Sequence, residues 1–209
     1  MVDRSALRLV EGSVVLTPLR EADAPALLDL ARESRDDIYP WMRWTDGFHS
    51  LDGAAARIAE WLSEWNRQQG YAFAAWDTDS GAMIGGGSLG QFNAKNRFCN
   101  LAYWVRTSAR GRGIGPTITR AVSRFGFEQL GLLRIEILME PENTASRRVA
   151  EKSGAQREGI LRNRILNLGG PKTALLYSLI PSDLSPTTSP LSGPGQVQSP
   201  APAPLSREP

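Results

Sequence analysis

The N-terminal part of the chain carries a short extended run and then two helical patterns. The apolar run over Ser13–Thr17 predicts a strand. Apolar residues spaced three and four positions apart predict helices over Glu21–Ala31 and Leu51–Gln69. Gly70 is expected to end the second helix, because glycine commonly follows a helix C-terminus.

After Gly70 the pattern becomes that of strands joined by tight turns. Strands are predicted over Tyr71–Trp76, Ala82–Gln91 and Phe98–Val105. Turn-forming residues, such as Asp-Thr-Asp-Ser-Gly at 77–81, separate them. Short connections between consecutive strands predict an antiparallel meander.

Strand and helix alternate in the C-terminal half. The sequence predicts a helix over Thr117–Leu130 and a shorter helix that Asn143 caps and Gly154 ends. Further strands are predicted over Arg134–Met139, Gln156–Arg162 and Ala174–Ile180. No internal repeat is present, so the order of elements predicts an α+β fold with a mixed sheet.

Composition separates a globular part from a polar tail. Of the 14 prolines among 209 residues, eight fall between Pro181 and Pro209, where large apolar residues are scarce. Such a segment buries too little apolar surface to offset its ordering entropy. We therefore expect one globular domain over residues 1–180 and a disordered Pro/Ser-rich tail over residues 181–209.

Several classes of function are disfavoured by composition. With one cysteine, Cys99, and one histidine, His49, neither an internal disulfide nor a metal site is expected. A net charge of +2 argues against a broad nucleic-acid surface. No run is apolar enough to span a membrane, and the N-terminus lacks a signal-peptide core, so we expect a cytoplasmic protein. A homodimer is compatible with the sequence, which does not specify the oligomeric state.

A glycine-rich segment joins the strand predicted over Phe98–Val105 to the helix predicted over Thr117–Leu130. Its glycines let the backbone approach a ligand, and the first amides and the dipole of the following helix attract anions. Its arginines add full positive charges. We predict that this segment binds a pyrophosphate through Arg110, Gly111, Arg112, Gly113, Ile114 and Gly115.

A dinucleotide-binding fold is the alternative for such a turn. The spacing here is G-x-G-x-G, whereas the dinucleotide fingerprint is G-x-G-x-x-G. The preceding strands also form a predicted meander rather than βαβ units. Both features disfavour this alternative.

Together with Glu142–Ser146, the glycine segment resembles the GNAT family of acetyl-CoA-dependent N-acetyltransferases. The likeness is to the RimJ/RimL-type branch, which acetylates N-terminal amines of ribosomal proteins. It runs from about Leu16 to Ile180. The segments that carry it are Tyr103–Val105, Ala109–Gly115, Phe125–Phe127, Arg134–Glu136, Glu142–Ser146 and Glu158–Gly159.

This resemblance implies a mixed central sheet, flanked by helices, in which strands Phe98–Val105 and Arg134–Met139 splay apart. Acetyl-CoA, the co-substrate, would lie in the resulting cleft. The resemblance places its pantetheine arm against Tyr103, Trp104 and Val105, and its pyrophosphate on the glycine segment. Asn143 and Ser146 would face the arm and the sulfur. A serine hydroxyl can donate a proton to a leaving thiolate.

The catalytic base that the resemblance implies is missing. The branch commonly has a glutamate that relays the proton of the amine, but the matching position holds Asn100, with Ala102 two residues later. Glu136 and His49 are the replacements to be considered. Each has a simpler interpretation, Glu136 as a surface strand residue and His49 as a solvated loop residue. Water, or weak catalysis, remains an alternative.

A missing base favours acceptors that lose a proton easily. An α-amine with a pKa of about 7.7 to 8.0 is neutral in about a tenth of molecules at pH 7, whereas a lysine amine near 10.4 is neutral in about 4 of 10,000. That difference is about 3 kcal/mol. The sequence therefore favours a protein N-terminal α-amine as acceptor.

The loop over residues 38–50 is expected to line the acceptor site, because binding residues concentrate in loops. Trp41, Trp44 and His49 are its predicted substrate-binding residues. An aromatic pocket with Asp36 and Asp37 nearby suits a cationic amine. An aminoglycoside, a polyamine, or a non-catalytic module that only binds acyl-CoA remain alternatives to the protein N-terminus.

Overall fold

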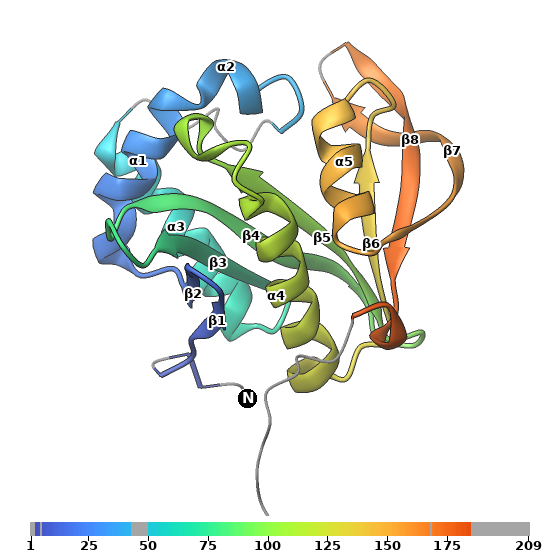
Figure 1. The fold of residues 1–209 in the computed structure, drawn as a ribbon, viewed down its shortest axis with the longest axis horizontal. Helices are drawn as coiled ribbons and strands as arrows, with labels where there is room; N and C mark the ends of the chain where they lie inside the picture. The colour runs from blue at the N-terminus through green and yellow to red at the C-terminus, as the bar shows by residue number, and fades with distance from the viewer. Residues whose placement is uncertain (1–2, 5, 43–49, 168, 185–209) are drawn as a thin grey trace, which may run out of the picture.

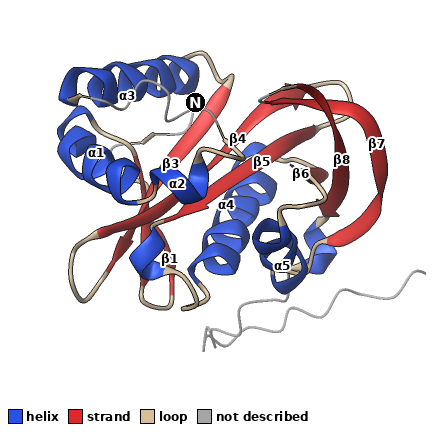
Figure 2. Ribbon diagram, turned by 90° about the horizontal axis from the view of Figure 1, so that it is seen from above, coloured by secondary structure: helices blue, strands red, loops and turns tan. Residues whose placement is uncertain are grey.

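The computed structural model describes residues 3–4, 6–42, 50–167 and 169–184. A mixed eight-stranded sheet in the order β1-β2-β3-β4-β5-β6-β8-β7 forms its centre (Figure 1). Helices α1 and α3 cover one face of the sheet, and α4 and α5 cover the other (Figure 2). The helices are α1 Ala24–Glu33, α2 Arg35–Ile38, α3 Leu51–Asn66, α4 Ile114–Leu130 and α5 Thr144–Lys152. The strands are β1 Leu9–Glu11, β2 Val14–Pro18, β3 Gly70–Asp77, β4 Met83–Asn93, β5 Phe98–Val105, β6 Arg134–Met139, β7 Gln156–Asn167 and β8 Gly170–Leu179.

The sequence predictions identify most of these elements and miss two short ones, β1 and α2. The meander is confirmed, since β3, β4 and β5 pair antiparallel in chain order. The C-terminus of α3 was predicted too late: the helix ends at Asn66, Gln68 takes a φ of +58°, and Gly70 opens β3. Helix α4 begins three residues before Thr117, because Gly113 adopts the left-handed conformation at its N-cap.

Glycines in β4 make room for a tryptophan of β5. A Cβ added to Gly86 would lie 2.4 Å from Cζ2 of Trp104, so no larger residue fits there. The Trp104 indole is 5% exposed and stacks on Trp61 of α3, with ring centroids 5.9 Å apart. The side chain of Trp104 thus belongs to the core between the sheet and helices α1 and α3.

The central strands diverge, as the resemblance implied. β5 pairs in parallel with β6 only where Phe98, Cys99 and Asn100 meet Arg134, Ile135 and Glu136. Beyond Asn100, both strands continue without pairing to each other. The backbone groups of β5 that face β6 over residues 101–105 are therefore available to a ligand.

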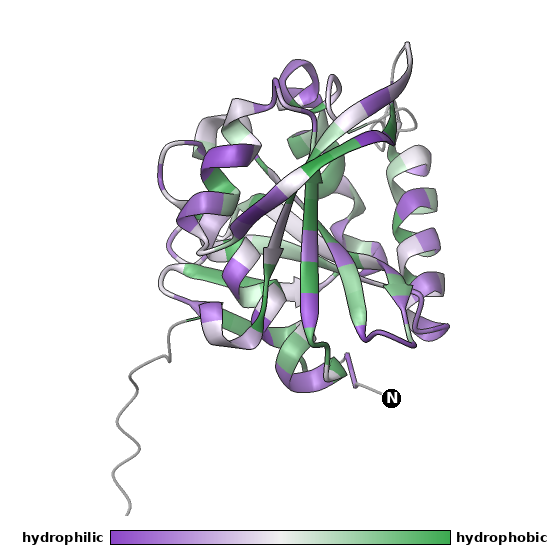
Figure 3. Ribbon diagram, turned by 90° about the vertical axis from the view of Figure 1, so that its right-hand side faces the viewer, coloured by the Kyte–Doolittle hydropathy of each residue, from purple (hydrophilic) through white to green (hydrophobic). Residues whose placement is uncertain are grey.

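Strands β7 and β8 form the wall of the molecule on the far side of β6. β8 pairs with β6, and β7 pairs with β8 at the edge of the sheet. Along this ribbon hydrophilic and hydrophobic residues alternate (Figure 3). Leu166, near the end of β7, is 84% exposed. Such exposed apolar surface at a strand end is available for contact with a ligand.

The described chain continues past β8 through a 3-10 helix, Pro181–Asp183, to Leu184, which packs against the core. Residues 185–209 of the predicted tail lie outside the described residues. Within the part of the chain that the structure describes, no helix is long and apolar enough to cross a membrane.

Candidate active site

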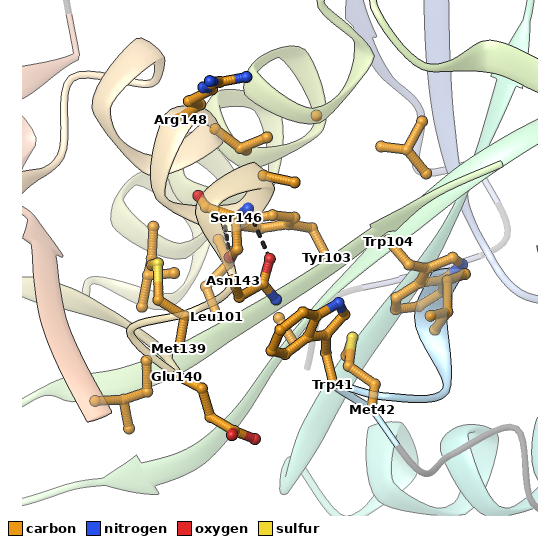
Figure 4. A pocket seen from close by; sticks show the side chains of 18 of the residues that line it. Trp41, Met42, Leu101, Tyr103, Trp104, Met139, Glu140, Asn143, Ser146 and Arg148 are labelled. Carbon is orange, nitrogen blue, oxygen red and sulfur yellow. Dashed lines mark hydrogen bonds between the residues drawn. The ribbon is translucent and has the colours of Figure 1, made fainter. Parts of the chain in front are cut away.

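A cavity of about 810 Å³ opens where β5 and β6 diverge. Its walls come from α2, the glycine segment, one side of α5 along its whole length and the end of β7. Figure 4 shows Arg148 at one end of this cavity and Glu140 with Trp41 toward the other. Its size is in the range of ligand-binding cavities.

The glycine segment presents open backbone to the cavity. Gly111 and Gly113 both have a φ of +79°, and an added Cβ would meet nothing within 4 Å at either position. The space beside them can therefore accept a ligand. Gly115 differs, since its added Cβ would lie 2.7 Å from the side chain of Val149 on α5. The first amides of α4, including that of Ile114, lie in the same wall, an arrangement that suits a pyrophosphate.

The two arginines of the glycine segment have different surroundings. Arg110 lines the cavity, with its Nη1 2.8 Å from Oδ1 of Asp37. Arg112 is not part of the cavity wall; its Nη2 lies 2.7 Å from Oδ2 of Asp77, whose side chain is 5% exposed. Backbone hydrogen bonding from Ser80 and the Arg112 guanidinium lower the pKa of Asp77 to about 2. The position of Arg112 indicates a structural ion pair and gives no support to its predicted contact with the cofactor.

Asp37 is the acidic residue that α2 brings to the cavity. The hydroxyl of Thr107 donates to its Oδ2 at 2.6 Å, and Arg110 pairs with its other oxygen. These two contacts lower the pKa of Asp37. Its negative charge is therefore already matched by groups of the protein.

The side chains of β5 alternate between the two faces of the sheet. Leu101, Tyr103 and Val105 pack with the core on the side of α4, whereas Trp104 packs on the side of α3. Trp104 can therefore contribute to a cofactor site mainly through its backbone, as the resemblance implied.

Asn143 caps α5, and its side-chain amide lies between Ser146 and Trp41 in the cavity. Its Oδ1 accepts a hydrogen bond from the backbone N–H of Ser146 at 3.0 Å. Among the described residues, its Nδ2 has no protein partner, and Figure 4 shows this group directed toward Trp41. The amide is thus both a helix cap and a free donor in the cavity.

Ser146 lies in contact with Tyr103. The phenol of Tyr103 donates to the backbone oxygen of Ser146 at 2.8 Å, and its oxygen lies 2.8 Å from Oγ of Ser146. Burial raises the pKa of Tyr103 far above its ordinary value. The phenol therefore stays protonated at neutral pH and cannot serve as a base.

The structure separates Asn100, the position where the expected base is missing, from Glu136, one of the two replacements considered. Asn100 lines the cavity, and its buried Oδ1 has no hydrogen-bond partner within the described part of the chain. Glu136 is its register partner on β6 but does not line the cavity; it accepts a hydrogen bond from Nε of Arg134 at 3.0 Å. The position of Glu136 does not support a role as the catalytic base.

On the acceptor side, Trp41 lies in the cavity wall together with Met42. Trp44 and His49 lie outside the described residues.

Sequence reasoning missed several residues of the wall, among them charged ones. Ala145, Arg148, Val149 and Lys152 line the cavity with Ser146, at helical spacing along α5. That spacing could have identified Arg148 and Lys152 once Ser146 had been singled out. Glu140 and Arg164 also line the cavity, and no sequence pattern indicated that either residue belongs to a binding site.

Comparisons with known proteins agree with this geometry. The family model of the acetyltransferase (GNAT) domain matches residues 13–156. A Bacillus subtilis (strain 168) protein named probable N-acetyltransferase YjcK is 30% identical over 155 residues, which cover 73% of this chain and 86% of that protein.

Two solved structures share the fold and part of the sequence. A Vibrio cholerae protein, described as a proposed ribosomal-protein-serine acetyltransferase, is 27% identical, with a TM-score of 0.73 over 84% of this chain and 98% of its own. Mycobacterium smegmatis RimJ, solved with CoA-disulfide, is 25% identical, with a TM-score of 0.74 over 82% of this chain and 84% of its own.

Proposed function

Because the chain belongs to the GNAT acetyltransferase family, and is thus an N-acetyltransferase that uses acetyl-CoA, we propose that its acceptor is the α-amine at a protein N-terminus. The similar structures from Vibrio cholerae and Mycobacterium smegmatis support this proposal. The first is described as a ribosomal-protein-serine acetyltransferase, and the second is named RimJ.

The charge distribution of the cavity is the observation that carries the proposal. Among the described residues, the wall contains two carboxylates, and that of Asp37 is paired with Arg110. Four cationic side chains line the same cavity: Arg110, Arg148, Lys152 and Arg164. Arg110 lies in the segment assigned to the pyrophosphate, and Arg148 lies at the end of the cavity away from Glu140 (Figure 4), so these two charges face the cofactor. A site whose acceptor end holds one unmatched carboxylate, that of Glu140, suits an acceptor with a single ammonium group. It disfavours aminoglycosides and polyamines, which carry several.

The apolar rim of the cavity also suits a peptide. Ile165 and Leu166 on β7 line it, and Leu166 is largely exposed. A peptide extends away from its reacting amine and can bury such a rim, whereas a small polar amine cannot.

In the proposed reaction the protein supplies positioning and proton transfer. The open backbone of Gly111 and Gly113 would hold the pyrophosphate of acetyl-CoA, and the unpaired edge of β5 would hold its peptide-like arm. Acetyl-CoA supplies the acyl group as a thioester. The hydroxyl of Ser146 would protonate the departing thiolate, with Tyr103 holding that hydroxyl in place.

Release of free CoA from acetyl-CoA tests the proposal, with three acceptors compared at equal concentration. These are a short peptide with a free N-terminus, spermidine and an aminoglycoside. We expect the largest kcat/KM with the peptide, and no release when its N-terminus is blocked. Faster turnover of spermidine or of the aminoglycoside would overturn the proposed acceptor.

A further inference from the structure

The acceptor end of the cavity holds a carboxylate that no cationic side chain of the described residues neutralises. Glu140 follows directly after β6 and lines the cavity, where Figure 4 shows it at the end away from Arg148. Within the described ranges it makes no ion pair. Its hydrogen-bond partner is the neutral side-chain amide of Asn167. Glu140 therefore differs from Asp37, the other carboxylate of the wall, which Arg110 and Thr107 already satisfy.

A short rigid unit connects Glu140 to Ser146. The backbone N–H of Asn143 donates to the backbone oxygen of Glu140 at 3.0 Å. The side chain of Asn143 in turn accepts from the backbone N–H of Ser146 at 3.0 Å. The Glu140 backbone is therefore fixed relative to the helix turn that carries the proposed proton donor.

Asn167 orients the carboxylate and connects the two sides of the cavity mouth. Its Nδ2 carries two protons, of which one is donated to Oε1 of Glu140 and the other to the backbone oxygen of Pro40 at 2.9 Å. Asn167 ends β7, and Pro40 lies just before Trp41. Oε2 of Glu140 takes no part in these bonds and remains able to accept from a ligand.

From this arrangement we propose that Glu140 binds the ammonium of the acceptor and removes its proton, in place of the base missing at Asn100. The inference rests on the proposed function, since it assigns a residue to acceptor activation. In the reaction, the ammonium gives one proton to the Glu140 carboxylate, and the neutral amine attacks the carbonyl carbon of the thioester. The C–N bond forms and the C–S bond breaks. The thiolate takes the hydroxyl proton of Ser146 and leaves as the free thiol, and the second proton of the nitrogen restores the Ser146 hydroxyl. Glu140 then returns its proton to solvent.

Other charged groups face the same cavity from neighbouring elements. Arg164 lies on β7, is exposed and makes no ion pair in the described part of the chain. The Asp37–Arg110 pair faces the cavity from α2 and the glycine segment. Arg164 repels additional positive charge, so the combination of Glu140 and Arg164 selects an acceptor with one ammonium.

The test compares Glu140→Gln with the wild-type enzyme. Glutamine keeps an oxygen that accepts from Asn167 and removes only the charge and the basicity. We expect kcat/KM for the acceptor to fall about 100-fold, in the range of general-base catalysis, while the KM for acetyl-CoA changes less than about twofold. Glu142→Gln is the matched control, because Glu142 lies on the same turn, is exposed and does not line the cavity.

A binding experiment measures the ammonium contact without turnover. Titration calorimetry in the presence of CoA compares the acceptor peptide with an analogue whose N-terminal amine is replaced by hydrogen. Wild type should prefer the amine at least about tenfold, and Glu140→Gln should lose that preference while binding the analogue normally. Glu140→Asp, which keeps the negative charge, should retain part of the preference for the amine over the analogue.

The proposal is overturned if Glu140→Gln stays within about threefold of wild type in kcat/KM for the acceptor and still prefers the amine. The kinetic comparison uses whichever of the three acceptors wild type acetylates fastest. Failure of the peptide acceptor would then be seen in wild type alone, separately from any failure of Glu140. Thermal unfolding and acetyl-CoA binding of each variant show whether its fold is intact.

Discussion

The phenol oxygen of Tyr103 on β5 lies 2.8 Å from the hydroxyl oxygen of Ser146 on α5. Because the phenol donates its proton to the backbone oxygen of Ser146, the single proton of the serine hydroxyl is left for the phenol oxygen or for another acceptor. A leaving thiolate is such an acceptor. The contact thus orients Ser146 without consuming its capacity to donate.

Ser146→Ala removes the proposed proton donor and should lower kcat about 10- to 100-fold, with little change in the KM for acetyl-CoA. Tyr103→Phe keeps the serine hydroxyl and only frees its orientation, so the loss should be smaller. Free thiol release at saturating acetyl-CoA measures both. An equal kcat for wild type and Ser146→Ala would remove Ser146 from the mechanism.

Gly113→Val should raise the KM for acetyl-CoA at least tenfold, because its side chain would occupy the open space beside the glycine segment. The substitution also strains a residue with a φ of +79°, at a cost of about 1–2 kcal/mol. Gly12→Val is the matched control: Gly12 has a φ of +59° and open space around its Cβ position, but lies in the turn between β1 and β2. It should lose stability and keep its affinity for acetyl-CoA. If the two variants bind acetyl-CoA equally well, the pyrophosphate does not lie at Gly113.

The two arginines of the glycine segment should differ in their effects. Arg112→Ala breaks the ion pair with the buried carboxylate of Asp77, so it should lower the melting temperature and leave the KM for acetyl-CoA within about twofold. Arg110→Ala should raise that KM, because Arg110 lines the cavity. Steady-state kinetics and thermal unfolding of both variants provide the measurement. A larger KM effect at Arg112 than at Arg110 would contradict this assignment.

The ion pair of Glu158 makes the free energy of unfolding depend on pH. The Arg134 guanidinium and the Ser178 hydroxyl lower its pKa from 4.5 to about 2. Since the pKa is lower in the folded state, this contribution to the free energy of unfolding is present above the ordinary pKa and is lost as pH falls toward 2. Urea unfolding at about pH 5 and about pH 3 should show a smaller decrease for Glu158→Gln than for wild type. An unchanged decrease would mean that the ion pair contributes nothing to acid sensitivity.

Local sequence patterns predicted the parts of the fold that depend on local chemistry. The Asn143 cap, the end of the same helix before Gly154 and the meander are of this kind, because each follows from residues close in the chain. The splay between β5 and β6 was inferred only through the family resemblance. No local pattern shows where two strands stop pairing.

The side-chain assignments that the structure does not support depend on contacts distant in sequence. Arg112 and Arg110 are equivalent by pattern, and only the position of Asp77 on β3 separates them. The alternation of β6 left the orientation of Glu136 undecided, and its contact with Arg134 places it off the cavity. No sequence pattern identified Glu140. Its proposed role depends on the hydrogen bond from Asn167, which lies 27 residues later at the end of β7.

Acetylation of a peptide that carries both a free N-terminus and an internal lysine tests the proposed acceptor most directly. Incubation with acetyl-CoA at about pH 7 lets the two amines compete within one molecule, and tandem mass spectrometry locates the acetyl group. We expect acetyl on the α-amine, with the lysine unmodified until the N-terminus is consumed. Acetyl on the lysine alone would contradict a protein N-terminal acetyltransferase.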